Sequence, residues 1–325
     1  MQILHVQFVL FIITLLDNAV HQAVTAAVDG AVDANYVLDV ADNSFGCTTY
    51  VRLARKAGLD KTLFNGKGPF TLFAPSNDAF TPDFLAQLES NSTLLNDVIR
   101  FHAIDGVIVT VKDIHKNDYL YPSCLANVSV RTNFYIEGTK VGVYMASGAF
   151  LTNGDYKADN GIVHYVINPM YPIPDTNIAK YIETNHTFSI LCDVIKSAGM
   201  IGPDLFRVLE GGNYTLFAPT NEAFQDMQPG ELKKLLSNHT LCWHTILRHM
   251  MNGTYYSEGV FDDQPELSSE GTYLHFKHDY QTDDSWQVEG IPVIEGNLSK
   301  TNGVLHVVHH LIPEPSMIKN KGCQN

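Results

Sequence analysis

The sequence predicts an α+β protein that contains two copies of one domain. The main observation is that the run Phe70–Phe80 (FTLFAPSNDAF) returns as Tyr214–Phe224 (YTLFAPTNEAF). A second run, Asn160–Ile167 (NGIVHYVI), returns as Asn302–His309 (NGVLHVVH). Because both runs recur in the same order and at nearly the same offset, the chain carries a duplicated domain. We call the two copies repeat one and repeat two.

The local patterns within each copy indicate helices that are separate from an antiparallel sheet. In both copies a proline ends the first β-prone run, and Ser76 or Thr220 then resembles the start of a helix. Residues 92–104 and 232–251 carry apolar side chains at the three-to-four spacing of amphipathic helices. Residues 129–167 are rich in Val, Tyr, Phe and Thr with Gly and Asn breaks, which predicts several short strands. This combination is typical of the α+β class.

The two ends of the chain predict export from the cell. A short apolar run near the start, followed by the small residues Val24-Thr25-Ala26, is typical of a signal peptide cleaved after Ala26. The end of the chain has no apolar segment for a membrane span or a lipid anchor. We therefore expect a secreted, extracellular protein with no membrane insertion. The expected segments are a signal peptide at 1–26, domains at 34–172 and 175–314, and a tail at 315–325.

The charge balance excludes some partner classes. Lys plus Arg number 21 and Asp plus Glu number 35, so the net charge is −14. A phosphate backbone or an anionic lipid surface requires a basic face, so neither nucleic acid nor such a membrane surface is expected as a partner.

Glycosylation sequons and cysteines agree with an oxidising, extracellular compartment. None of the sequons has Pro in its middle position. The chain has no Cys-x-x-Cys pair, which removes the usual zinc and redox spacings. One disulfide is expected within each repeat, Cys47 with Cys124 and Cys192 with Cys242, while Cys323 lies beyond the second domain. The seven sequon asparagines are Asn91, Asn127, Asn185, Asn213, Asn238, Asn252 and Asn297.

The two repeated runs resemble the hallmark segments of the fasciclin-domain family, Thr-Leu-Phe-Ala-Pro-(Ser/Thr)-Asn-(Asp/Glu)-Ala-Phe and Asn-Gly-(aliphatic)₂-His. Both repeats carry both segments, and the resemblance covers residues 34–314. It implies that each domain is an antiparallel β wedge with a bundle of helices. It also implies extracellular adhesion or matrix organisation, without catalysis and without a cofactor. The partners implied are extracellular matrix proteins or cell-surface receptors.

Four histidines recur at equivalent places in the repeats, His102 with His249 and His164 with His306. A feature of the fold must recur on duplication and a ligand site need not, so we interpret all four as buried structural imidazoles. The alternative is a zinc site in the run His306-Val307-Val308-His309-His310. On a strand only His306 and His310 would share a face, with no carboxylate between them, so no metal site is predicted.

Candidate receptor contacts are few. Leu38-Asp39-Val40 matches a short integrin-recognition tripeptide, but we assign it to the start of the first helix. The resemblance implies integrin contacts through a Tyr-His and an Asp-Ile pair, neither of which is reproduced in full. Asp155 and Tyr156 are the predicted partner contacts, and integrin binding stays open. The corresponding pairs in this chain are Phe101-His102, Arg248-His249, Asp155-Tyr156 and Asn297-Leu298.

The leading functional hypothesis is a secreted matrix or adhesion glycoprotein that acts as a non-catalytic binding module. One alternative is a secreted carrier that holds a lipid or glycan between the sheet and the helices. Another is an acidic matrix protein associated with mineral, although the chain has no Asp-rich run. An enzyme is the least favoured class, because the nucleophile-elbow, zinc-protease and phosphate-loop motifs are missing.

Overall fold

The computed structural model describes residues 35–43, 46–66, 68–136, 142–262, 264–279 and 285–314. From Tyr36 onward they belong to one compact unit. The expected signal peptide, the tail and Cys323 lie outside the described residues. Within the described ranges, no helix combines the length and the apolar character needed to cross a membrane.

Repeat one contains a seven-stranded sheet in the order β2-β1-β7-β6-β5-β4-β3. All neighbours are antiparallel except β1 and β7, which run parallel with Phe70 opposite Gly161. The predicted α+β class is confirmed, and the sheet is antiparallel apart from this one pair. A parallel pair needs a long crossover, and the helices and strands between β1 and β7 supply it. The strands are β1 (Phe70–Pro75), β2 (Ala103–Asp105), β3 (Tyr119–Pro122), β4 (Ser129–Ile136), β5 (Gly142–Ala146), β6 (Ala149–Ala158) and β7 (Gly161–Val166).

Repeat two has the same topology, in the order β12-β13-β14-β15-β8-β9, with a separate β10-β11 pair. Here β15 and β8 are the parallel neighbours, and Gly303 lies opposite Tyr214. A Cβ atom at Gly161 or Gly303 would clash with the carbonyl of the facing residue, which explains the glycine of the second repeated run. The strands are β8 (Tyr214–Pro219), β9 (Met250–Asn252), β10 (Glu266–Leu267), β11 (Tyr273–Leu274), β12 (Phe276–Asp279), β13 (Ser285–Val288), β14 (Ile291–Lys300) and β15 (Gly303–Val308).

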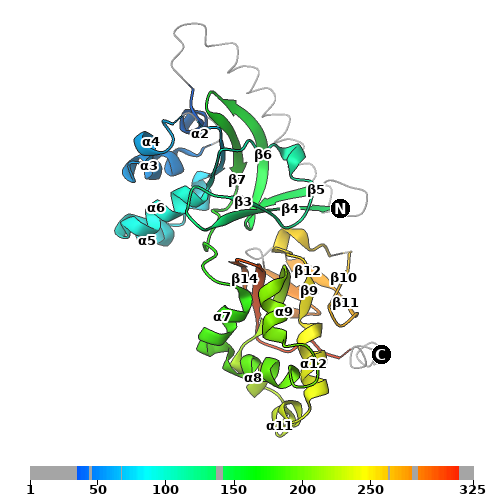
Figure 1. Ribbon diagram of the computed structural model, residues 1–325. Helices are drawn as coiled ribbons and strands as arrows, with labels where there is room; N and C mark the ends of the chain where they lie inside the picture. Colours follow the sequence, from blue (N-terminus) through cyan, green and yellow to red (C-terminus); the bar gives the residue numbers. More distant parts are fainter. Residues whose placement is uncertain are drawn as a thin grey trace. The chain divides into compact units, whose positions relative to one another are not determined.

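The helices of each repeat gather on one side of its sheet (Figure 1). In repeat one they are α2 (Val37–Asn43), α3 (Thr48–Lys56), α4 (Leu59–Thr62), α5 (Pro82–Ser90) and α6 (Ser92–Phe101), with 3₁₀ turns η1 (Asn77–Ala79) and η2 (Val111–Asp113). In repeat two they are α7 (Ile178–Thr184), α8 (Ser189–Ala198), α9 (Leu205–Gly211), α10 (Asn221–Gln225), α11 (Glu231–Leu236) and α12 (His239–Arg248), with η3 (His186–Phe188) and η4 (Ser257–Gly259).

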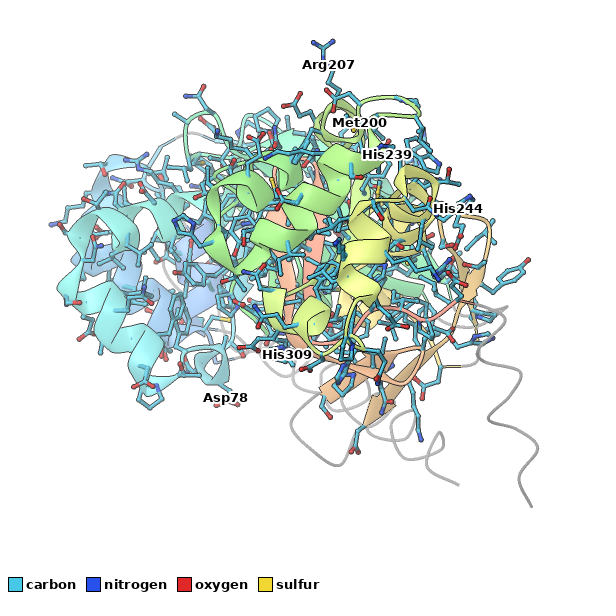
Figure 2. The ribbon with its side chains drawn as sticks, turned by 90° about the horizontal axis from the view of Figure 1, so that it is seen from below. Asp78, Met200, Arg207, His239, His244 and His309 are labelled. Carbon is cyan, nitrogen blue, oxygen red and sulfur yellow. The ribbon has the colours of Figure 1, made fainter. Side chains whose placement is uncertain are left out.

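The predicted helical segments are found, with one break. The helix expected at 92–104 is α6, which begins after its N-cap Asn91. The stretch 232–251 holds two helices, because Asn238 accepts a hydrogen bond from the Leu241 N–H and caps a new helix there. Elsewhere in repeat two, Met200 in the turn after α8 and Arg207 of α9 lie at the surface (Figure 2).

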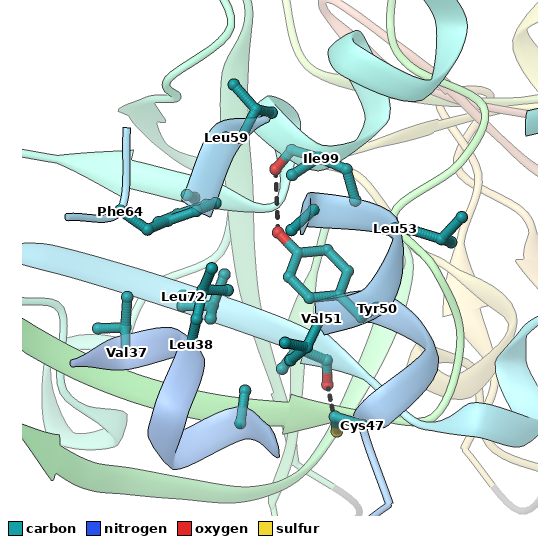
Figure 3. Close-up of a cluster of buried hydrophobic side chains, with 14 of the residues drawn as sticks. Val37, Leu38, Cys47, Tyr50, Val51, Leu53, Leu59, Phe64, Leu72 and Ile99 are labelled. Atoms are coloured by element: carbon teal, nitrogen blue, oxygen red, sulfur yellow. Dashed lines mark hydrogen bonds between the residues drawn. The ribbon is translucent and has the colours of Figure 1, made fainter. Parts of the chain in front are cut away.

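The helices and the sheet of repeat one enclose an apolar core around Tyr50 (Figure 3). The Tyr50 ring is fully buried, and its hydroxyl donates to the Ile99 carbonyl at 3.0 Å. A buried phenol needs such a partner, because an unsatisfied hydroxyl costs about 1–3 kcal/mol. The equivalent core of repeat two is packed around Phe188, Leu191 and Phe224.

Strand β4 is buried on both faces, because its second face contacts repeat two. Arg131, only 3% exposed, donates from Nη1 to Asp118 Oδ1 at 3.1 Å and to Asn213 Oδ1 at 2.7 Å. Its Nη2 donates to the Thr301 carbonyl at 2.9 Å. A buried guanidinium is tolerated only when its donors are satisfied, and here repeat two supplies two of the acceptors.

An apolar cluster completes this contact, which we call the joint. Tyr135 and Met145 of repeat one pack with Tyr256 and Val304 of repeat two. The Tyr135 hydroxyl donates to the Thr254 carbonyl at 2.6 Å. Apolar packing and the hydrogen bonds of Arg131 and Asp118 to repeat two together hold the two repeats against each other.

Candidate functional site

The histidines His102 and His249 make the same pair of backbone hydrogen bonds in their repeats. His102 Nδ1 lies 2.7 Å from the Val98 carbonyl, and its Nε2 accepts from the Met170 N–H at 2.9 Å. His249 Nδ1 lies 2.7 Å from the Thr245 carbonyl, and its Nε2 accepts from the Ile312 N–H at 2.9 Å. Each ring therefore ties the end of a helix to the segment that follows the last strand of its repeat.

The second histidine pair fixes a bulge. His164 Nε2 donates to the Val109 carbonyl at 2.7 Å, and its Nδ1 accepts from the Asp155 N–H at 3.2 Å. In repeat two, His306 Nε2 donates to the Tyr255 carbonyl at 2.9 Å, and Nδ1 accepts from the Asn297 N–H at 3.1 Å. These bulges lie in β6 and β14, where the register shifts.

All four imidazoles are neutral, and both ring nitrogens of each one are hydrogen-bonded. Burial lowers the pKa of His102, His249 and His306 to about 4. Burial also lowers the pKa of His164. Since both ring nitrogens of each are already bonded to backbone groups, none has a lone pair to offer a metal ion. The interpretation of these residues as structural agrees with this geometry.

The alternative zinc cluster does not form. Both ring nitrogens of His306 are already hydrogen-bonded to backbone groups. Strand β15 ends at Val308, so His309 and His310 are not on the strand. His309 Nδ1 instead lies 3.2 Å from Thr220 Oγ1 and 3.3 Å from Glu222 Oε2. Across the described part of the chain, no three His, Cys, Asp or Glu side chains gather as a metal site.

The asparagines of the repeated runs have matching roles that the sequence did not reveal. Asn160 accepts from the Val37 N–H at 2.9 Å and donates to the Phe64 carbonyl at 2.8 Å. Asn302 likewise accepts from the Ile178 N–H at 2.9 Å and donates to the Leu209 carbonyl. Each side chain joins the first helix of its repeat to the start of the last strand. Their recurrence in both runs was the signal that could have identified them.

The predicted contact pair, Asp155 and Tyr156, is largely engaged within repeat one. Asp155 has a positive φ of 64°, and its Oδ1 accepts from the Val111 N–H at 2.8 Å. Tyr156 packs edge-on against Tyr165, with ring centroids 5.0 Å apart, and borders the helical core. Asn297 makes the same turn contact in repeat two, through the Ser257 N–H at 2.9 Å. A partner role for Asp155 and Tyr156 stays a prediction.

The integrin-like tripeptide is helical, as expected. Leu38 and Val40 are buried in α2, and Asp39 Oδ2 accepts from the Tyr36 N–H at 3.0 Å. With its apolar side chains inward, the tripeptide is not an extended recognition loop.

The predicted disulfides are absent, and no bridge joins any of the four described cysteines to another. Cys47 Sγ donates to the Ala74 carbonyl at 3.6 Å (Figure 3), and Cys242 Sγ donates to the Leu235 carbonyl at 3.2 Å. Burial raises the pKa of the Cys47 and Cys124 thiols to about 12, so little thiolate is present for oxidation. The expectation of one bridge per repeat is therefore not met, because Cys47 and Cys242 sit as small apolar groups in the cores.

The sequon asparagines occupy two kinds of position. Asn91 and Asn238 are exposed N-caps of α6 and α12, Asn185 caps η3, and Asn127 and Asn252 are exposed. Asn213 and Asn297 use their side-chain amides internally, Asn213 at the joint and Asn297 at the bulge.

An exposed aromatic surface on β3 was not anticipated. Tyr119 is 53% exposed, and its ring makes a tilted contact with the half-buried Tyr121, with ring centroids 4.6 Å apart. Leu120, between them in the chain, is also exposed. Strand β3 forms one edge of the sheet. The run Tyr-Leu-Tyr looks like a buried strand in the sequence, so only its place at the edge of the sheet reveals its exposure.

Comparisons with known proteins agree with this duplicated architecture. The family profile described as "Fasciclin domain" matches residues 45–172 and 186–314. The predicted domains, 34–172 and 175–314, begin earlier because they include α2 and α7.

Several proteins are similar in sequence. Human periostin is 31% identical over 276 residues, which cover 83% of this chain and 31% of periostin. The transforming growth factor-beta-induced protein ig-h3 of Sus scrofa is 29% identical, covering 76% of this chain and 35% of that protein. The chain thus spans about a third of the length of these relatives. A solved FAS1 domain pair from the insect cell adhesion molecule fasciclin I aligns with a TM-score of 0.41 at 16% identity, covering 84% of this chain and 98% of that one.

Proposed function

Because the chain belongs to the fasciclin-domain family, we propose that it is a secreted, extracellular binding protein of cell adhesion or matrix organisation. Its partners are matrix proteins or cell-surface receptors, and it acts without catalysis. The observation that carries the proposal is the exposure of two large side chains on strand β3, Tyr119 at 53% and Leu120 at 44%. Tyrosine is enriched among the residues that dominate protein–protein interfaces.

The internal use of the motif residues supports a binding role in place of a chemical one. The imidazoles of His102, His164, His249 and His306 are held by backbone groups. These contacts support a structural role for the four histidines in each repeat. A general base needs a free nitrogen within reach of a substrate, and these nitrogens are already engaged.

The position of β3 favours contact with an extended segment of a protein partner. An edge strand presents backbone groups that can pair with another strand, and alternate side chains then give specificity. Tyr119 and Tyr121 lie two residues apart on β3 with their rings in tilted contact, so the half-buried Tyr121 supports the exposed ring of Tyr119. The joint places Asp118, the residue before this strand, in contact with Arg131 and with repeat two. The contacts of Asp118 thus hold the start of strand β3 in place.

The test is cell attachment or matrix capture by the immobilised protein that carries Tyr119→Ser. We expect binding to fall at least fivefold, because a central tyrosine of an interface typically contributes more than about 1 kcal/mol. The melting temperature should stay within about 2 °C of the wild type, since exposed substitutions change stability by less than about 0.5 kcal/mol.

The matched control is Tyr273→Ser, an exposed tyrosine of repeat two. Equal losses in both variants would indicate a nonspecific effect of tyrosine removal and would contradict a contact at β3. Capture of a small molecule instead of any protein would favour the carrier hypothesis. Tyr156→Phe, which retains the packing on Tyr165, tests the sequence-based contact separately.

A further inference from the structure

Repeat two exposes a second apolar surface, which lies next to a sequon. Tyr273 is 64% exposed and Leu267 is 51% exposed, and they are directly opposite each other in the β10-β11 pair. Opposed residues of an antiparallel pair point to the same face. Two large apolar side chains in contact with water at one place indicate a surface that something covers.

The sequon asparagine Asn252 continues this row. Met251 of β9 faces Ser268 in an antiparallel bridge, and the Ser269 N–H donates to the Met250 carbonyl at 2.7 Å. One position further along this register, Asn252 lies opposite Leu267. Adjacent strands are about 4.8 Å apart, so Asn252, Leu267 and Tyr273 form a row about 10 Å long across three strands.

Asn252 is placed to carry a sugar. Its side chain is exposed, and it is the last residue of β9, in the sequon Asn252-Gly253-Thr254. By contrast, Asn297 accepts from the Ser257 N–H at 2.9 Å and donates from Nδ2 to Ser257 Oγ at 2.7 Å. The nitrogen that would carry a glycan is thus engaged at Asn297.

Repeat one offers a natural comparison. There Ile104 faces Ser123 in the matching bridge, so the equivalent row is Asp105, Pro122 and Ser129. This row has no sequon asparagine and no large apolar side chain, although Ser129 is the third residue of the sequon that begins at Asn127. Of these two rows, that of repeat two alone combines a sequon asparagine with an exposed apolar pair.

We propose that Asn252 is glycosylated and that Leu267 and Tyr273 form the platform on which its first sugars pack. The C–H face of a pyranose is apolar, and an aromatic ring with a polar tip suits such a face. The sugars cover the two side chains and keep this surface from acting as a docking site. This inference rests on the proposed extracellular function, because N-glycans are acquired in the secretory pathway.

Peptide mass spectrometry of the secreted full chain tests occupancy, and a double-mutant cycle tests the platform. We expect Asn252 to be modified and Asn297 to be unmodified. Loss of the sugar in Asn252→Gln should lower the melting temperature by about 2 °C. In a Tyr273→Ser background the same change should lower it by less than half as much, because the sugar has lost its platform.

Two controls separate the sugar from the side chains. After enzymatic deglycosylation the coupling between positions 252 and 273 should vanish. The same cycle with Asn91→Gln, an exposed helix cap, should show no coupling to Tyr273. An unmodified Asn252 beside occupied sequons elsewhere overturns this inference and leaves secretion intact. If all sequons are unmodified, both this inference and the proposed secretion are overturned. If Asn252 is modified but shows no coupling to Tyr273, the packing of the sugar on Leu267 and Tyr273 is overturned.

Discussion

Strands β4 and β12 occupy the same place in the two sheets but have opposite burial patterns. In β12 and the residues before it, Leu274 and Phe276 are buried while His275 and Lys277 are exposed. In β4 every residue from Val130 to Asn133 is buried, including Arg131. The alternating pattern belongs to a sheet with one wet face, and the continuous pattern to a sheet covered on both faces. The comparison shows that both repeats share the hydrogen bonds of the four histidines, whereas only repeat one contributes its strand β4 to the joint.

Acid should cause the largest loss in the free energy of unfolding. It should affect both repeats, because each contains equivalent buried histidines. Burial holds the folded-state pKa of three histidines at about 4, against about 6.5 in the unfolded chain. The unfolded state binds more protons between these values, so stability is full above about pH 6.5 and falls as the pH drops towards 4. Each histidine contributes about 3 kcal/mol of this loss at pH 4.

Denaturant unfolding at a series of pH values measures the acid effect. Replacing His102 with Gln should reduce the slope of the free energy of unfolding against pH in this range. The reduction should correspond to about one proton fewer taken up on unfolding. A free energy of unfolding that is constant from pH 6.5 to 4.5 would contradict buried neutral imidazoles.

Arg131→Ala should destabilise the protein by about 3–5 kcal/mol, because it leaves Asp118 with a buried, unpaired charge. Lys277→Ala, on the exposed face of β12, is the matched control and should cost less than about 0.5 kcal/mol. Equilibrium unfolding in urea provides both values. Similar values for the two variants would show that the joint does not hold the repeats together.

A further contrast lies at Leu59 and Met200, which follow the equivalent Ala-Gly pairs of the two repeats. Leu59 is 1% exposed, whereas Met200 is 73% exposed (Figure 2). Leu59→Ala should cost about 2–5 kcal/mol through the cavity that it leaves. Met200→Ala should change stability by less than about 0.5 kcal/mol. Thermal melting of both variants checks this difference, and a large effect at Met200 would contradict its exposure.

His164→Ala and His306→Ala should have the smallest but most equal effects, about 1–3 kcal/mol each, because each breaks two buried hydrogen bonds. Calorimetry should show similar losses in the two variants. Added chelator should leave the wild-type melting curve unchanged. A drop of several degrees with chelator would instead restore the zinc hypothesis.

The sequence by itself determined the duplication and the α+β class, and it identified the four recurring histidines. These depend on short-range pattern and on recurrence, since a residue that closes the same turn in two copies must appear in both. The tertiary structure alone decided which surfaces of the copies differ. The burial of Arg131, the exposure of Tyr119 and the unbridged state of the four described cysteines depend on contacts between residues far apart in the chain. Residue type does not encode such contacts, because a strand buried on both faces and an exposed edge strand can have the same local composition.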